Sequence, residues 1–184
     1  ILPGGVVTKK AAAHIQLDEN GEFVRNPKED LVKVAVVERH QGTGNVACGF
    51  LKGYGIKEGA VALSVAHDSH NIIVVGVNDE EMEFAVNSLI AQEGGIVLVK
   101  EGKVIEQMPM PIAGLMSDQS GEWVDEKLTS IHEKAYTELG ICGDVEPVMT
   151  LCFMSLAVIP EIKLTDMGLF DVTTFSFIPV EISR

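Results

Sequence analysis

In 184 residues the chain carries 27 acidic against 14 basic side chains, a formal net charge of −13, and 46% of its residues are hydrophobic. That hydrophobic share is enough to build a packed core and excludes a disordered chain, while the negative balance disfavours nucleic acid and anionic membrane surfaces as partners. No apolar run reaches the roughly 18 residues of a membrane span, so we expect a cytoplasmic protein.

The first residues, Ile-Leu-Pro-Gly-Gly, lack the basic region and apolar stretch of a signal peptide. Because they do not begin with methionine, we expect a longer natural sequence or a trimmed one. The three cysteines, Cys48, Cys142 and Cys152, are an odd number without CxxC spacing. They predict three buried, reduced thiols, which again favours the cytoplasm.

Residues 1–28 are the least regular part of the chain and include a polar turn, Asp18–Gly21. We interpret them as a segment that leads in from a preceding region, with a short hairpin around Asn20-Gly21. The compact domain is expected over residues 29–184. Its first element is a buried strand, which the valine-rich run Leu31–Glu38 predicts.

Three apolar runs follow within a glycine-spaced region. Asn45–Leu51 predicts a strand or a short helix, and Ala60–Ala66 and Ile72–Val77 predict two strands. Further along, Ile96–Lys100 and Lys103–Met108 are separated by two residues, Glu-Gly, which is typical of a tight hairpin.

The two main helices have the clearest boundaries. Asn78, with Glu81 three residues later as in a capping box, predicts the start of the first helix, and Gly94-Gly95 predicts its end. An apolar stripe predicts the second helix over about Gly121 to Leu139.

The last third of the chain is less clear. Val148–Val158 is apolar and fits helix or strand equally, whereas Phe170–Val180 alternates like one or two final strands. Several β-strands with about two main helices predict a mixed, α+β domain. The order in which the strands pair does not follow from the sequence.

Three polar clusters interrupt these elements, and the first is Glu38–Asn45. Its glycines permit a ligand loop, in which Arg39 would be a planar donor and His40 a proton carrier, with Thr43 and Asn45 beside them. The alternative is a tight structural loop in which Arg39 pairs with Glu38 or another acid.

The second cluster, Ser64–Asn71, contains His67, Asp68, Ser69 and His70 between two apolar strands. Asp68 could orient one histidine and leave the other face free to exchange protons, or the two rings could share a metal if the segment is helical. The structural alternative is a hydrogen-bonded turn organised by Asp68. A Ser–His–Asp nucleophile is disfavoured, because no G-x-S-x-G elbow surrounds Ser64 or Ser69.

The third cluster, Pro111–Asp118, favours a connection into the second helix, with Ser117 or Asp118 near its cap. Several known motifs are missing from the chain: a His-x-His pair, a Walker loop, the zinc-deaminase pattern and a dinucleotide fingerprint.

The motifs together resemble the adenine deaminase family, from about Val7 to the C-terminus. The octad Ser64–Asn71 is the most specific part of the resemblance. The matching segments are Val37–Asn45, Gly53–Ile56, Ser64–Gly76, Gly94–Lys100, Gly102-Lys103, Pro109–Asp118 and Met149–Asp166.

The resemblance implies a metal-dependent amidohydrolase, in which a (β/α)₈ barrel is followed by an extra C-terminal domain. Such enzymes convert adenine and water to hypoxanthine and ammonia in purine salvage, with manganese or iron activating the water. Their metal ligands begin with a His-x-His pair on the barrel. This chain has no such pair, so the resemblance implies the C-terminal domain alone, with no metal ligands. The barrel would be an upstream region, a partner chain or an omitted part.

We expect the domain to be inactive in isolation, to pack on the barrel and to belong to a homo-oligomer. The His67–Asn71 loop would lie at the junction with the barrel and complete the pocket for adenine, with Arg39, His40 and Ser117-Asp118 as its neighbours. Three alternatives stay open. The domain could be purely structural or an oligomerisation domain, an independent purine-binding module, or a hydrolase that uses His67, Asp68 and Arg39.

Overall fold

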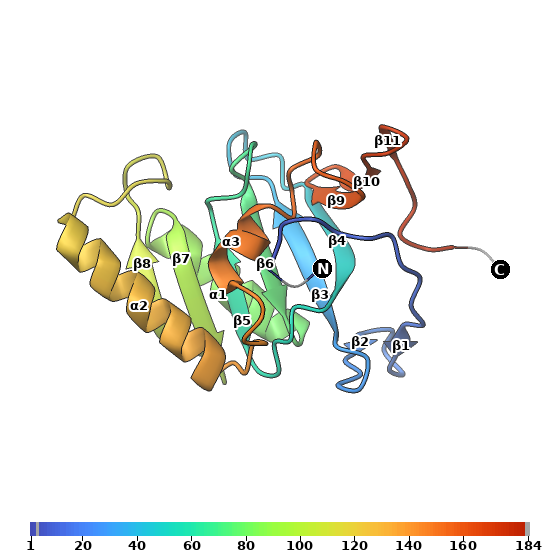
Figure 1. Ribbon diagram of the computed structural model, residues 1–184, viewed down its shortest axis with the longest axis horizontal. Helices are drawn as coiled ribbons and strands as arrows, with labels where there is room; N and C mark the ends of the chain where they lie inside the picture. Colours follow the sequence, from blue (N-terminus) through green and yellow to red (C-terminus); the bar gives the residue numbers. More distant parts are fainter. Residues whose placement is uncertain (3, 183–184) are drawn as a thin grey trace.

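A six-stranded antiparallel sheet with strand order β4-β3-β6-β5-β7-β8 forms the centre of the computed structural model (Figure 1). The structure describes residues 1–2 and 4–182. Pro3, in the predicted leading segment, and residues 183–184, at the end of the predicted domain, lie outside the described residues. The strands are β3 (Leu31–Val37), β4 (Val46–Lys52), β5 (Ala60–Leu63), β6 (Ile72–Gly76), β7 (Gly95–Lys100) and β8 (Lys103–Pro109).

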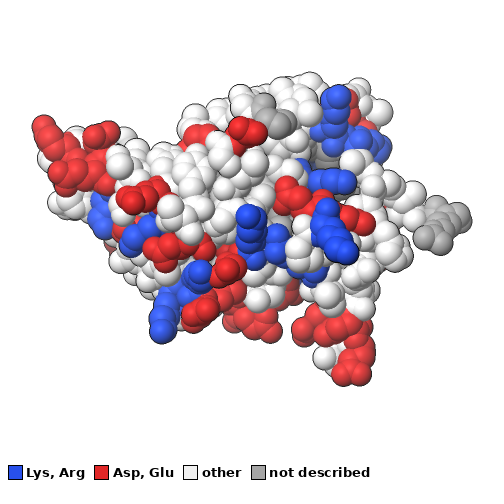
Figure 2. Space-filling view, turned by 60° about the horizontal axis from the view of Figure 1, so that its bottom comes forward, with Lys and Arg blue, Asp and Glu red and all other residues white. Residues whose placement is uncertain are grey.

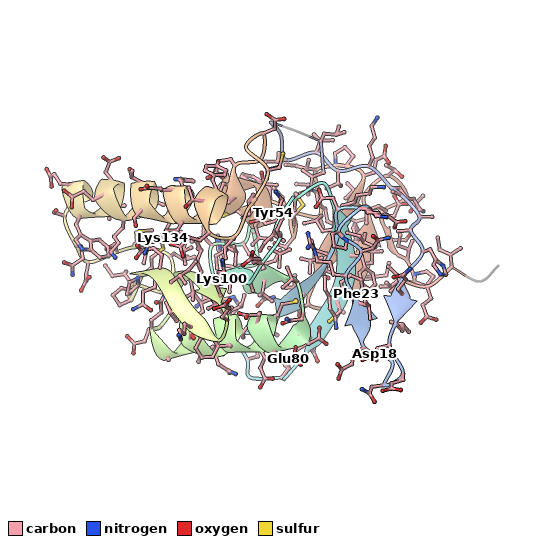
Figure 3. All side chains as sticks on the ribbon, turned by 90° about the horizontal axis from the view of Figure 1, so that it is seen from below. Asp18, Phe23, Tyr54, Glu80, Lys100 and Lys134 are labelled. Carbon is pink, nitrogen blue, oxygen red and sulfur yellow. The ribbon has the colours of Figure 1, made fainter. Side chains whose placement is uncertain are left out.

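The central strands of this sheet are apolar at every position, so both faces of the sheet must be covered by other parts of the chain. Alternate residues of a strand point to opposite faces, so Val61 and Leu63 of β5 face one core layer while Ala60 and Ala62 face the other. The two layers lie under different helices. Figure 3 views the sheet from below, with α1 (Asp79–Ala91) and α2 (Gly121–Thr137) on opposite sides.

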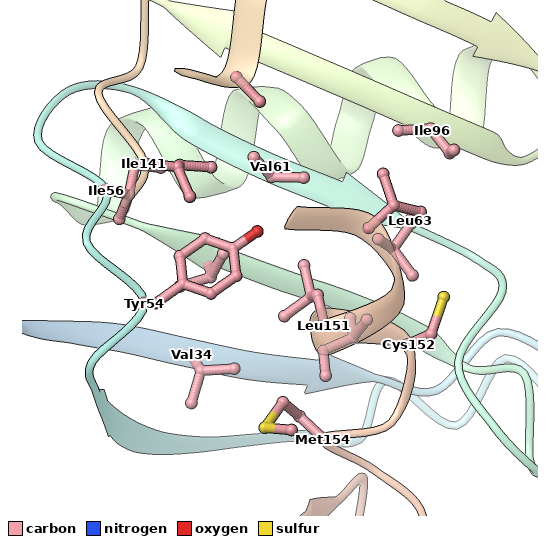
Figure 4. Close-up of a cluster of buried hydrophobic side chains, with 14 of the residues drawn as sticks. Val34, Tyr54, Ile56, Val61, Leu63, Ile96, Ile141, Leu151, Cys152 and Met154 are labelled. Carbon is pink, nitrogen blue, oxygen red and sulfur yellow. The ribbon is translucent and has the colours of Figure 1, made fainter. Parts of the chain in front are cut away.

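The α2 side holds the larger core. Its centre lies under the short helix α3 (Pro147–Cys152), where Leu151 and Tyr54 are fully buried together (Figure 4). The Tyr54 hydroxyl donates to the Pro147 carbonyl at 2.8 Å, so the one polar atom of this ring is satisfied. The α1 side is thinner, since small alanines of the sheet let that helix approach closely.

Capping residues mark the start of both long helices. The Asn78 side chain accepts from the Glu81 N–H at 2.8 Å, as predicted, but the Glu81 carboxylate accepts from Gly102 N instead of returning to Asn78. Only half of a capping box therefore forms. The N-cap of α2 is Ser120, so the prediction of Ser117 or Asp118 near that cap is corrected by two or three residues.

Smaller elements complete the chain. The hairpin predicted around Asn20-Gly21 is confirmed, with β1 (Gln16–Leu17) pairing β2 (Phe23–Val24). The predicted final strands belong to a three-stranded sheet that also takes in the preceding segment. This sheet has the order β11-β10-β9 and contains β9 (Ile162–Thr165), β10 (Gly168–Asp171) and β11 (Ser176–Phe177).

The segment before β3 lies against that smaller sheet. The Thr8 hydroxyl donates to the Ile162 carbonyl at 2.7 Å, and Lys10 forms an ion pair with Asp171 at 3.2 Å. A domain boundary near residue 28 stays a prediction. The α+β class and the two long helices are confirmed.

Side-chain exposure corrects the prediction for the cysteines. All three are free, but Cys48, on the edge strand β4, and Cys142, after α2, are exposed. Only Cys152 is buried, and burial raises the pKa of its thiol to about 12.

Elsewhere on the surface, acidic side chains gather at the projecting ends of the face in Figure 2. In the described part of the chain, no helix is long and apolar enough to cross a membrane.

Candidate functional site

Four connections meet along one edge of the large sheet. Since every pairing is antiparallel, β3, β5 and β8 all end at the edge where β4, β6 and β7 begin. Figure 1 shows the connections after β3, β5 and β8 on the upper side of the sheet. We call this edge the loop edge. It consists of residues 38–45, 64–71, 92–94 and 110–120. All three polar clusters of the sequence therefore fall on it.

The His67–Asn71 segment is a turn tied to its neighbours by backbone groups. His70 N donates to the Ala66 carbonyl at 2.7 Å, which closes the turn. His67 N donates to the Cys152 carbonyl at 2.9 Å, and the Ser155 hydroxyl donates to the His67 carbonyl at 3.0 Å. The C-terminal end of α3 therefore sets the position of the turn.

The two imidazoles of this turn lie together. The His67 ring packs on Phe153, with ring centroids 4.7 Å apart, and meets His70 edge-on at 5.4 Å. The Asp68 carboxylate is 81% exposed, and its Oδ1 lies 3.8 Å from His67 Nδ1. That distance is too long for a hydrogen bond, so Asp68 does not orient the ring in the way the sequence suggested.

His70 is the less satisfied of the two rings. Within residues 1–2 and 4–182, its Nδ1 is buried and has no hydrogen-bond partner, and its Nε2, which is not buried, has none either. Burial, followed by the nearby charges of His67 and Arg39, lowers the pKa of His70 below its ordinary value. The ring is therefore neutral at pH 7 and turns one free nitrogen towards the surface.

Arg39 joins three connections of the loop edge. Its Nε donates to the His70 carbonyl at 2.5 Å and its Nη2 to the Ala113 carbonyl at 2.8 Å. Its backbone N–H donates to Asn71 Oδ1 at 3.3 Å. His40 lies beside it, with Nε2 2.7 Å from the Ser69 carbonyl. The structure thus brings Arg39 and His40 to the histidine turn, as the sequence predicted.

The Glu38–Asn45 loop is held by its own carboxylate. Glu38 accepts from the backbone N–H of Thr43, Gln41 and His40, and these bonds, the Thr43 bond first, lower its pKa to about 2. Thr43 Oγ1 in turn accepts from Asn45 N at 3.2 Å. The structural alternative was right about a tight loop but wrong about an ion pair between Arg39 and Glu38. Thr43 and Asn45 order this loop and are exposed.

The turn after β8 is clamped from beneath. The Ser64 hydroxyl is fully buried, donates to the Gly114 carbonyl at 2.5 Å and accepts from Gly95 N at 2.7 Å. Ser64 therefore has a structural role, in which its hydroxyl links the turn after β8 to the start of β7. Among the described residues, Ser117 and Asp118 bond to the neighbouring Gln119, and neither lines the hollow described below.

A substitution at Gly114 tests how tightly this turn is held. The φ of Gly114 is +73°, and a Cβ there would lie 2.7 Å from Arg39 Nη1. We expect Gly114→Ala to lower the free energy of unfolding by about 2 kcal/mol, because the substitution adds both backbone strain and a clash. Urea denaturation checks this result. Gly121→Ala, where nothing lies within 4 Å of the added Cβ, is the matched control and should change stability little.

These connections surround an open hollow of about 480 Å³. Its polar lining comes from Arg39, His40, Ser69, His70 and Glu93, and the turn Pro111–Leu115 supplies the opposite wall. Sequence reasoning missed Glu93, which follows α1 and gave no signal of its own. It also missed the carbonyls of Ala113 and Gly114, since backbone groups leave no mark in composition.

The imidazoles of the loop edge differ in their surroundings. Within residues 1–2 and 4–182, no three His, Cys, Asp or Glu side chains converge to hold a metal ion. His67 is packed on an aromatic ring and His40 Nε2 is bonded to a carbonyl, so the rings do not point at one position. A neutral imidazole and a fixed guanidinium can instead bind and orient a polar group.

Residues 5–176 match the family model described as the adenine deaminase C-terminal domain. The chain belongs to this family. It is 71% identical over 181 residues to adenine deaminase 2 of Desulfotalea psychrophila, covering 98% of this chain and 31% of that protein. Adenine deaminases of Ligilactobacillus salivarius and Halalkalibacterium halodurans are 49% and 47% identical, with 99% of this chain covered in each case. The resemblance seen in the motifs is confirmed.

The chain spans about a third of the length of these relatives, with 31% or 32% of each covered. The family match includes the loop edge in full.

Proposed function

We propose that this chain is the C-terminal domain of an adenine deaminase, which converts adenine and water to hypoxanthine and ammonia in cytoplasmic purine salvage. In this proposal the loop edge packs on a (β/α)₈ barrel that binds manganese or iron. The His67–Asn71 turn completes the wall of the active-site pocket. The family match supports the first part, and the paired imidazoles of His67 and His70 beside an open hollow carry the second.

The residues of this chain would act by binding and positioning. His70, neutral at pH 7, offers Nε2 to a polar group of the substrate or of the opposing pocket wall. His67 holds the His70 ring edge-on and is itself fixed on Phe153. Packing of the loop edge on the barrel would exclude water from the hollow. The metal would supply the activated water and would be held by ligands of the barrel.

The first test is the double variant His67→Ala/His70→Ala in the full-length enzyme. We expect kcat/KM for adenine to fall about tenfold, the size expected when one positioning interaction is lost, while manganese content stays unchanged. His132→Gln is the matched control. It removes a histidine from α2 and can keep the hydrogen bond to Glu146, so its kinetics should match the parent enzyme.

Unchanged kinetics in the double variant would overturn the assignment of these histidines to the pocket. A loss of bound metal would instead mean that they act on the metal centre. A purely structural domain is the second candidate, because the carbonyls of the loop edge are largely satisfied within the chain. It predicts lower stability with unchanged turnover.

An independent purine-binding module is the third candidate, because the hollow collects polar side chains from several connections of this chain. It predicts that adenine raises the melting temperature of the isolated chain.

A further inference from the structure

The turn Pro111–Met116 presents apolar side chains to solvent at the loop edge. Ile112 and Met116 face each other across an isolated antiparallel bridge, and they are 46% and 59% exposed. Exposed large apolar side chains are ordinary when scattered. These two share one rigid turn beside a polar hollow, which is the arrangement of an interface with an apolar centre and a polar rim.

The turn is rigid because it is held at two adjacent carbonyls. Arg39 binds the Ala113 carbonyl and Ser64 binds the Gly114 carbonyl. A preformed surface loses little conformational entropy when a partner binds. The clamp therefore favours a docking role for the turn over a loose surface loop.

Arg39 adds a positive charge that has no counter-ion among residues 1–2 and 4–182. Nε and Nη2 are bonded to carbonyls, whereas Nη1 has no hydrogen bond, and no carboxylate of the described residues forms an ion pair with the guanidinium. Glu93 lines the same hollow without pairing with it. A partly buried cation is stabilised by a carboxylate that reaches its free N–H groups.

We propose that Arg39 and the turn Pro111–Met116 form the docking surface for the preceding domain of the same polypeptide. Apolar side chains of that domain pack on Ile112 and Met116, and one of its carboxylates binds Arg39 Nη1. The occupant follows from two observations, the unmatched positive charge and the length of the relatives, of which this chain covers only about a third. This inference rests on the proposed function.

Thiol labelling of the full-length enzyme tests the surface directly. Ile112→Cys and Met116→Cys are introduced singly after Cys48→Ser and Cys142→Ser, and reaction with a maleimide is timed under native conditions. Thr129→Cys, at an exposed position of α2, is the control. We expect the thiols in the turn to react at least about tenfold more slowly than the control thiol, because docking buries them.

Equal rates at the turn and at the control would overturn the docking surface. Protection that disappears on dilution would mean that a second copy of the chain covers the turn, which also overturns the proposal. Protection that is independent of protein concentration supports a domain of the same polypeptide.

A second pair of variants tests the carboxylate. Adding Arg39→Glu to Met116→Cys should raise the labelling rate to that of the control, since two negative charges would then face and repel each other. Adding Ser64→Ala instead loosens the same turn without changing charge and should leave the thiol protected. Equal effects of the two substitutions would overturn the bound carboxylate.

The kinetics of the His67→Ala/His70→Ala enzyme do not enter these rates. Failure of the docking surface and failure of the pocket role proposed for these histidines are therefore separate results.

Discussion

Replacing Leu151 by alanine is expected to lower the free energy of unfolding by about 3–4 kcal/mol. Leu151 is fully buried under α3, facing the sheet beside Tyr54 and Val34 (Figure 4). Removing three carbon atoms there loses their transfer free energy and leaves a cavity that the surrounding strands cannot fill. Urea denaturation at neutral pH measures the difference.

The size of this effect follows from the shortness of α3. A helix of six residues is not stable on its own, so the burial of its apolar side chains is what keeps it formed. Met149→Ala is the matched control on the same helix. Met149 is 52% exposed, and its loss should change stability by less than about 0.5 kcal/mol. Equal effects of the two substitutions would show that α3 is not anchored through Leu151.

The Leu151→Ala substitution should also affect the structure of the loop edge. The Cys152 carbonyl at the end of α3 accepts from His67 N, and the Phe153 ring supports the His67 side chain. A loosened α3 should therefore speed hydrogen exchange at the His67 amide more than at amides in β7. Packing under the sheet and geometry at the edge are linked through this one helix.

Local signals explain which elements the sequence could predict. The start of α1 is marked by Asn78, whose side chain accepts from Glu81 N–H, and the β7–β8 hairpin turns at Glu101-Gly102, where both residues have positive φ. Each signal acts within a few residues. Such features are readable without any knowledge of the rest of the chain.

Long-range contacts explain what the sequence could not predict. The strand predicted over Ala60–Ala66 ends at Leu63, and the next residue, Ser64, bonds through its hydroxyl to Gly114, fifty positions later in the chain. The strand order has the same origin. The placing of β3 beside β6, and of β5 beside β7, is decided by how two apolar faces are covered at once.

The residues of the candidate site also divide into those that the sequence could predict and those that it could not. The histidines and Asp68 were visible as a rare polar cluster, and Arg39 and His40 as a second one. The 111–116 turn contributes mainly through the carbonyls of Ala113 and Gly114, which every residue type possesses. The polar side chains that the sequence marks out in this segment belong to Ser117 and Asp118, and these bond to Gln119.

The second large effect on the free energy of unfolding is expected at Lys163. This β9 side chain is 1% exposed, and its Nζ donates to the Val6 carbonyl at 2.7 Å beneath the N-terminal segment. No carboxylate of the described residues forms an ion pair with it. Burial without a counter-charge lowers the pKa of Lys163 from 10.5 to about 8.

That pKa makes stability depend on pH. Between pH 8 and 10.5 the unfolded chain keeps the Lys163 proton while the folded chain has lost it, so the unfolded state binds more protons. The free energy of unfolding therefore rises with pH across this window, by about 3 kcal/mol in total. Below pH 8 the full penalty of burying the charge is present and constant.

Lys163→Met is expected to remove this rise. At pH 7 it should also increase the free energy of unfolding by about 1–3 kcal/mol, because the cost of burying a charge disappears while the Val6 carbonyl loses its donor. Urea denaturation at pH 7 and pH 10 measures both effects. Lys163→Arg, which stays charged at both pH values, should be less stable than the parent and should show no rise.

The comparison with the methionine variant isolates Lys163 from other groups that titrate in this range. Burial raises the pKa of Cys152 and of Tyr54, so stability falls as pH rises through their unfolded values, the opposite sign to Lys163. Both residues are present in the parent and in the variant, and their contributions cancel in the difference. Parallel pH profiles of the two proteins would mean that Lys163 stays charged and solvated in the folded state. In that case the N-terminal segment would not cover it in solution.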